Sequence, residues 1–148
     1  VLFNSTDNWH LWKVSVDGGE PSQLTDFVAS TPEVSPDGKV IACIGRNESK
    51  RRLLILPMGG GPAVKEMDFF GWVSRIQWMN DGQAVIYAGE RKGRRAIIKQ
   101  SLNAGLSEEP LNLDTDELFD FGYSPDGRSF ALNRGIWLSD LVLISGLN

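Results

Sequence analysis

The side chains that could do covalent chemistry are few and far apart in this chain. Ser74, Ser107 and Ser145 lie outside any Gly-x-Ser-x-Gly elbow, the strained turn that presents a nucleophile. His10 is the only histidine, and without a placed partner it predicts a partly exposed loop residue rather than a catalytic base. Cys43 lies in an apolar stretch, where a buried, unreactive thiol is at least as good a prediction as a reactive one. We therefore predict no catalytic residue.

No metal or cofactor site is predicted either. An acidic run holds Asp114, Asp116, Glu117 and Asp120, but its spacing does not match a Ca²⁺-binding loop, so we expect a solvated connecting loop. The single cysteine excludes a cysteine-rich zinc site. The glycines at 59–61 lead into an expected strand, so no helix N-terminus is expected there to hold a phosphate.

Basic residues form two short clusters, which hold seven of the 15 lysines and arginines. The clusters are Lys50, Arg51 and Arg52, and then Arg91, Lys92, Arg94 and Arg95. A basic rim attracts an acidic partner or an anionic surface. The alternative is a pair of solvated hairpin ends whose charge is neutralised by nearby acidic residues, such as Asp26 and Asp68.

Two of the five tryptophans are further candidates for partner binding. Trp9 and Trp72 lie in expected loops, where a large aromatic side chain can anchor a partner. The alternative is that they are ordinary exposed aromatics, which are normal on a protein surface. The other tryptophans occupy expected strands and are assigned to the core.

One turn is repeated three times and indicates which elements position these residues. It begins at Ser35, Met79 and Ser124 and ends each time in Asp-Gly, so the repeats are 44 and 45 residues apart. A period of that length is typical of a β-propeller, in which each blade is a four-stranded antiparallel sheet. In the first and third copies Pro sets φ for the turn, and in all three Gly supplies positive φ.

Alignment to this turn predicts about three and a half blades and no helix. The expected units are residues 1–27, 28–68, 69–113 and 114–148, with three, four, four and three strands. The fold class is therefore an all-β propeller fragment that forms an open arc. The two basic clusters fall between the second and third strands of neighbouring units, so we expect them side by side on one face of the propeller.

Composition narrows the classes of binding partner that we expect for this chain. The net charge of −4 argues against a general nucleic-acid binder, because phosphate binding needs a positive footprint. The longest apolar run, Leu53–Leu56, is far too short to span a membrane. The chain is expected to begin inside a strand at Val1, as a truncated piece, and to end near a natural C-terminus at Asn148. Exposed end blades then predict pairing with the rest of the propeller or homo-oligomerisation.

The order of a Pro-Asp-Gly turn, an apolar strand, a strand rich in Ile, Leu or Trp, and a Gly-Gly turn resembles the TolB-type propeller repeat. Residues 17–25 carry the Gly-Gly and the Leu-Thr ending of that pattern, and the resemblance covers nearly the whole chain. The third repeat departs from it, with Met79-Asn80 in place of Ser-Pro. Residues 137–145 resemble the C-terminal end of propellers fused behind bacterial Ser/Thr kinase or winged-helix regulator domains. A periplasmic or other extracytoplasmic location is favoured over a cytoplasmic one.

The resemblance implies a fold rather than an activity, so three functions stay open. The first is a non-catalytic module that binds a protein or small ligand for a larger protein, through loops on one face or through the central channel. The second is the accessory propeller of a prolyl-oligopeptidase-like serine peptidase. The third is a half-propeller that completes itself by oligomerising.

Overall fold

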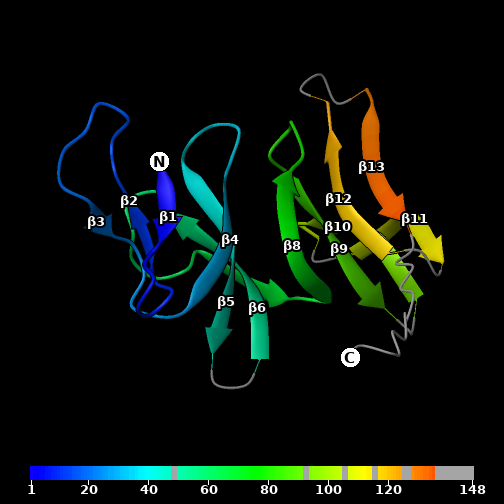
Figure 1. Cartoon of the computed structure of the whole chain (residues 1–148), viewed down its shortest axis with the longest axis horizontal. Helices are drawn as coiled ribbons and strands as arrows, with labels where there is room; N and C mark the ends of the chain where they lie inside the picture. Colours follow the sequence, from blue (N-terminus) through cyan, green and yellow to red (C-terminus); the bar gives the residue numbers. More distant parts are fainter. Residues whose placement is uncertain (48–49, 92–93, 105–106, 115–116, 125–127, 136–148) are drawn as a thin grey trace, which may run out of the picture.

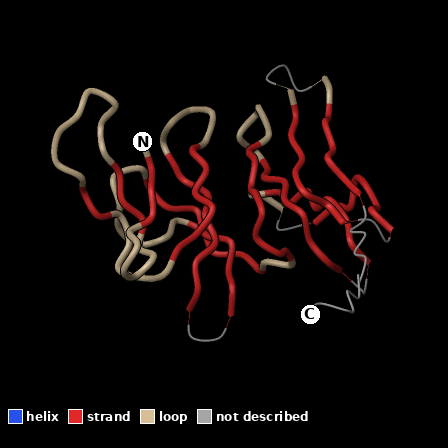
Figure 2. Tube along the Cα trace, viewed as in Figure 1, coloured by secondary structure: helices blue, strands red, loops and turns tan. Residues whose placement is uncertain are grey.

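The computed structural model describes residues 1–47, 50–91, 94–104, 107–114, 117–124 and 128–135. These residues form thirteen strands and no helix (Figure 2). The strands make four antiparallel sheets, which stand next to one another as an open arc (Figure 1). The expected all-β propeller fragment is confirmed. The expected strand at 140–144 lies outside the described residues.

Each sheet follows the chain in order, as a propeller blade does. The first blade contains β1 (Leu2–Asn4), β2 (Leu11–Lys13) and β3 (Ser22–Gln23). The second contains β4 (Ala29–Val34), β5 (Val40–Asn47), β6 (Lys50–Pro57) and β7 (Lys65–Asp68). The third contains β8 (Gly71–Trp78), β9 (Ala84–Arg91), β10 (Arg94–Ser101) and β11 (Ser107–Asp114). The fourth contains β12 (Glu117–Tyr123) and β13 (Phe130–Gly135).

The repeated turn joins the first two strands of a blade, on the upper side of the molecule in Figure 1. In the second blade the Asp37 carboxylate accepts hydrogen bonds from the Ser35 hydroxyl, at 2.7 Å, and from the backbone N–H of Lys39, at 3.1 Å. Asp81 accepts the corresponding backbone bond in the third blade. Gly38 and Gly82 have φ of 72° and 66°, which glycine adopts without strain. The turn therefore keeps its geometry although Met79-Asn80 replaces Ser-Pro.

Three apolar clusters lie between neighbouring blades and hold the arc together. Successive strand residues point to opposite faces of a sheet, so the second blade presents two apolar faces. Ile41 and Cys43 pack toward the first blade, whereas Ala42 and Ile44 pack toward the third. A further cluster, which includes Ile86 and residues of β12 and β13, joins the third blade to the fourth. Burial on both faces explains why these strands are continuous apolar runs.

The second hairpin of each central blade is longer than the sequence indicates. Residues 46–52 are expected to form a polar loop, but β5 and β6 stay paired up to Asn47 and Lys50. The hairpin of β9 and β10 stays paired up to Arg91 and Arg94 in the same way. The basic residues therefore lie on paired strands, where alternation assigns neighbouring residues to opposite faces.

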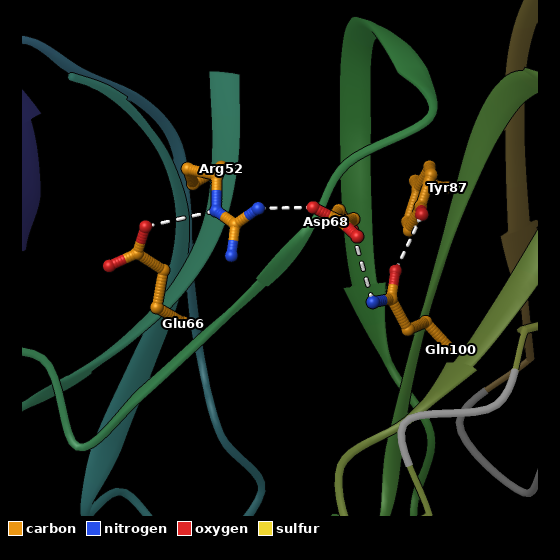
Figure 3. Close-up of polar contacts among 5 residues, drawn as sticks. All are labelled: Arg52, Glu66, Asp68, Tyr87 and Gln100. Atoms are coloured by element: carbon orange, nitrogen blue, oxygen red, sulfur yellow. Dashed lines mark hydrogen bonds and ion pairs between the residues drawn. The ribbon is translucent and has the colours of Figure 1, made fainter. Parts of the chain in front are cut away.

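A buried polar network links the second and third blades (Figure 3). The Tyr87 hydroxyl donates to the side-chain carbonyl of Gln100 at 2.6 Å, and the Gln100 amide donates to the backbone carbonyl of Asp68 at 3.1 Å. Only 2% of Gln100 is exposed, so its amide depends on these partners. The ring of Tyr87 also packs on Phe69, with centroids 4.8 Å apart. The network fixes the connection between the two blades.

Tyr87→Phe is expected to lower the free energy of unfolding by about 1–3 kcal/mol, because it leaves the buried Gln100 carbonyl without its donor. Adding Gln100→Leu should recover part of this loss. Leu56, 44 residues earlier, shows that the repeat accepts leucine at that place. The measurement is urea unfolding of both single variants and the double variant. Strictly additive losses would show that the two side chains are not coupled.

Candidate functional site

Arg52 does not contribute a free charge to the predicted basic rim. Its guanidinium donates to Glu66 at 2.9 Å and forms a second ion pair with Asp68 (Figure 3). These two acidic residues come from β7, the strand next to β6. The positive charge of Arg52 therefore meets two carboxylates of its own blade, and one of them, Asp68, is among the acidic residues that the sequence suggested.

Lys50 and Arg51 are exposed, and the structure adds Arg46 to them. Arg46 and Arg51 are direct partners in the register of β5 and β6, and Asn47 and Lys50 are the next pair. Like charges placed opposite each other on neighbouring strands are destabilising. Among the described residues, no ion pair compensates Arg46, Lys50 or Arg51. The described residues of this hairpin end therefore bring three positive charges together without an ion pair among themselves or to other described residues.

The backbone register of the hairpin of β9 and β10 repeats this pairing of arginines. Arg91 and Arg94 are register partners, whereas Arg95 lies between Glu90 on one neighbouring strand and Asp114 on the other. Lys92 lies outside the described residues. The two hairpin ends point to the same lower side of the molecule in Figure 1. The register therefore places each arginine pair at the end of its hairpin, on that side.

Trp9 is exposed and has an uncommon backbone conformation. It is 59% exposed, and its φ is +58°, which is rare for a bulky residue other than glycine. The conformation is held by the Trp9 carbonyl, which accepts from the Ala29 N–H at 3.0 Å and from the Asn4 amide at 3.2 Å. A strained residue that exposes a large aromatic side chain points to a functional role. The sequence placed Trp72 in a loop, which is wrong, because it lies in β8.

Two backbone hydrogen bonds connect Trp9 and Arg46 to the same short segment, Val28 and Ala29, from its two sides. Ala29 donates to the Trp9 carbonyl, and Arg46 donates to the carbonyl of the preceding residue, Val28, also at 3.0 Å. Val28 is itself 43% exposed. We call the surface formed by Trp9, Val28, Arg46, Lys50 and Arg51 the tip surface. It combines an aromatic side chain, an apolar side chain and three positive charges.

A second polar site, which the sequence reading missed, lies along the first strands of neighbouring blades. Arg75 on β8 is 3.5 Å from Asp120 on β12, and it also attracts Glu33 on β4. The Gln77 amide bridges the same blades, because its carbonyl accepts from the Tyr123 N–H at 2.9 Å and its nitrogen donates to the Tyr123 carbonyl at 3.3 Å. The acidic residue Asp120 is therefore part of a strand rather than of the expected loop.

A cleft of about 460 Å³ adjoins these residues and is a second candidate site. Its charged groups, Arg75 and Asp120, pair with each other, and the Gln77 amide bonds the backbone of Tyr123. The sequence does contain a signal for this site, because Glu33 and Gln77 each lie four residues before the aspartate of the repeated turn. Burial raises the pKa of Glu33, and the neighbouring Arg75 guanidinium partly opposes that shift.

Cys43 and His10, the two residues with potentially reactive side chains, lie in surroundings that favour a structural role. Cys43 is fully buried, and burial raises the pKa of its thiol to about 12, so the reactive thiolate is scarce at neutral pH. The His10 ring lies 2.9 Å from the Gln23 amide nitrogen and is half-buried. Among the described residues, no group of three metal-ligating side chains forms a metal site. In that part of the chain, no helix is long and apolar enough to cross a membrane.

Comparison with solved structures identifies the architecture. The chain superimposes on a protein assigned as TolB from Agrobacterium tumefaciens with a TM-score of 0.70 and 25% identity. It superimposes on TolB from Acinetobacter baumannii with a TM-score of 0.64 and 17% identity. The chain has the fold of part of a TolB-like propeller. The four described sheets thus correspond to consecutive blades of such a propeller.

The sequence comparisons are less decisive. No family model matches the chain. Over 141 residues it is 28% identical to the uncharacterized peptidase YuxL of Bacillus subtilis (strain 168). The match covers 95% of this chain and 20% of that protein, and the structural matches cover 49% and 34% of the two TolB chains. The TolB-like fragment therefore spans half or less of the proteins it matches.

Glu33→Gln is expected to raise the free energy of unfolding at pH 7 by less than about 1 kcal/mol, because a half-buried carboxylate is partly screened by water. Burial disfavours the charged form, so the folded-state pKa lies above the ordinary value of 4.5. The contribution of Glu33 to the free energy of unfolding is therefore most favourable below pH 4.5, and it is lost as pH rises through the folded-state pKa. The difference in the free energy of unfolding between Glu33→Gln and wild type should therefore disappear in acid.

The measurement is urea unfolding of wild type and variant at pH 7 and at about pH 4, just below the ordinary pKa of a glutamate side chain. Glu20→Gln is the control, because Glu20 is exposed in a loop. A Glu33→Gln protein that is less stable than wild type at pH 7 would show that attraction to Arg75 outweighs burial.

Proposed function

We propose that this chain is a non-catalytic binding module, and that its tip surface docks a protein partner with acidic side chains. The observation that carries the proposal is the opposed pair Arg46 and Arg51, next to Lys50, without a compensating ion pair in the described part of the chain. An acidic partner would relieve the repulsion between these charges. The TolB-like propeller fold supports a binding role.

The tip surface suits a protein better than a nucleic acid. The whole chain has a net charge of −4, so a uniform polyanion meets long-range repulsion and only local attraction. Trp9 and Val28 add apolar area beside the charges. Tryptophan and arginine are the side chains that most often dominate protein interfaces. The cleft beside Arg75 and Asp120 is the weaker candidate, because these two charged groups already pair with each other.

The test is binding of a poly-glutamate peptide to the chain, measured by calorimetry at low and moderate salt. Arg46→Ser with Arg51→Ser is expected to weaken binding about tenfold or more, and added salt should weaken the wild type in the same direction. The matched control removes two charges elsewhere, Lys39→Ser with Lys65→Ser, and should bind like wild type. Trp9→Ala is expected to weaken binding without unfolding the chain.

Two outcomes would overturn this proposal. One is equal loss of binding in the control variant, which would show that only overall charge matters. The other is binding of a DNA duplex as tightly as the acidic peptide, which would point to a nucleic-acid surface. An extracytoplasmic location belongs to the same proposal, and fractionation of the source cells would test it.

A second candidate function is the accessory propeller of a prolyl-oligopeptidase-like serine peptidase. The observation that favours it is the 28% identity to the uncharacterized peptidase YuxL. In that case the hydrolase would be a separate domain of the parent protein. The reading frame of the parent protein decides between the binding module and the peptidase propeller, because the peptidase requires a Gly-x-Ser-x-Gly elbow in that protein. A third candidate, an oligomerising half-propeller, requires a solution mass above that of the monomer, 16.4 kDa.

A further inference from the structure

The alternating faces of β5 and β6 separate the arginines of this hairpin from one another. Ile44 and Leu53 are register partners, and both pack toward the third blade. Nearer the hairpin end, alternation places Arg46 and its register partner Arg51 on the same face. Arg52 is the neighbour of both Arg51 and Leu53, so it belongs to the opposite face, toward the first blade. The arginine pair of the tip surface therefore lies on the face toward the third blade.

The arginine pair of the next hairpin lies on the face that looks back at the second blade. Tyr87 and Ile98 are register partners in the apolar cluster between the second and third blades. The register of β9 and β10 is continuous from there to the hairpin end, so Arg91 and its partner Arg94 take the same face. Both hairpin ends point to the lower side of the molecule (Figure 1). We call the four residues of the two pairs the facing arginines: Arg46, Arg51, Arg91 and Arg94.

The acidic residues in register with these hairpin ends belong to the other faces of the two blades. Asp68 is the register partner of Arg52, so it belongs to the face toward the first blade. Glu90 and Asp114 are the register partners of Arg95 on its two sides, and these three belong to the face toward the fourth blade. In the described strands, none of the facing arginines has an acidic register partner. The register thus directs positive charge alone to the side where the two blades meet.

The convergence of the two pairs is not a consequence of the repeat. At the 44-residue spacing of the repeated turn, Arg46 corresponds to Glu90, and Arg91 corresponds to Asn47. Equivalent positions take the same face of their blades, so arginines at equivalent positions would look in the same direction. The two pairs look toward each other because each blade has its arginines at a different position of the hairpin end.

The chemistry of the facing arginines indicates the occupant. Four like charges on one side of two neighbouring blades attract several negative groups at once. The forked guanidinium of arginine matches the geometry of a carboxylate. We propose that one acidic segment of the docking partner contacts both arginine pairs, so that the two hairpins form a single binding surface. This inference rests on the proposed function and adds the third blade to it. Contacts that belong to one segment reinforce each other, because the second contact forms within the complex.

The test is calorimetry of a peptide of ten glutamates with the 148-residue chain at low salt. Packed sheets lie about 10 Å apart, so ten residues at about 3.3 Å each are long enough to reach both blades. One peptide is expected to bind per chain. Arg91→Ser with Arg94→Ser should weaken binding about tenfold or more, as should Arg46→Ser with Arg51→Ser, because either change removes one of two linked contacts.

Arg95→Ser with Lys99→Ser is the matched control. Both residues belong to β10, and the register places them on the face toward the fourth blade. The control thus removes the same charge from the same strand, on the opposite face, and should bind the peptide like wild type. Circular dichroism of every variant confirms that it is folded before its binding is compared.

The outcomes separate the two proposals. If binding depends on Arg46 and Arg51 but not on Arg91 and Arg94, the joint surface is wrong and the tip surface stands. Two peptides per chain, or an equal loss of binding in the control, would also overturn the joint surface. If tripolyphosphate binds as tightly as the peptide and needs both pairs, the facing arginines hold a small polyanion and the inference is overturned. If the peptide does not bind wild type at all, the proposed docking function itself fails.

Discussion

The structure depends on burial of apolar side chains between neighbouring sheets. A blade of four short strands cannot bury both of its faces by itself, so each blade needs a neighbour on either side. The second blade shows this most clearly, because alternate residues of β5 enter different clusters, Ile41 and Cys43 on one side and Ala42 and Ile44 on the other. Polar bridges, such as the Trp78 indole that donates to the Glu33 carbonyl at 2.9 Å, then fix how one blade meets the next.

The fold could be predicted from the sequence because its strongest signal is local. An Asp-Gly turn is specified by its own residues, and three copies at a constant spacing place the strands between them. Hairpin length was predicted less well. Arg46, Arg51 and Arg52 look like a polar loop, yet they are paired strand residues. Pairing depends on partners in the neighbouring strand, Arg52 with Asp68 for example, and composition does not show such partners.

The candidate site was predictable only in part for the same reason. The basic clusters were visible as composition, but the sequence could not distinguish Arg52, which pairs with Glu66 and Asp68, from Arg51, which has no ion pair among the described residues. Neither could it show that Trp9 and Arg46 bond to the backbone of the same segment, at Ala29 and Val28.

The two ends of a blade carry different constraints, and we propose that binding takes place at the hairpin ends. The turn at Asp37 sets the register of β4 and β5, and the paired length of β5 and β6 carries that order down to Lys50. A slip of one residue between β5 and β6 would exchange the faces of Arg51 and Arg52. Arg52 would then leave its acidic partners, Glu66 and Asp68. The register between β5 and β6 therefore determines which arginine pairs with Glu66 and Asp68, although neither arginine takes part in the core.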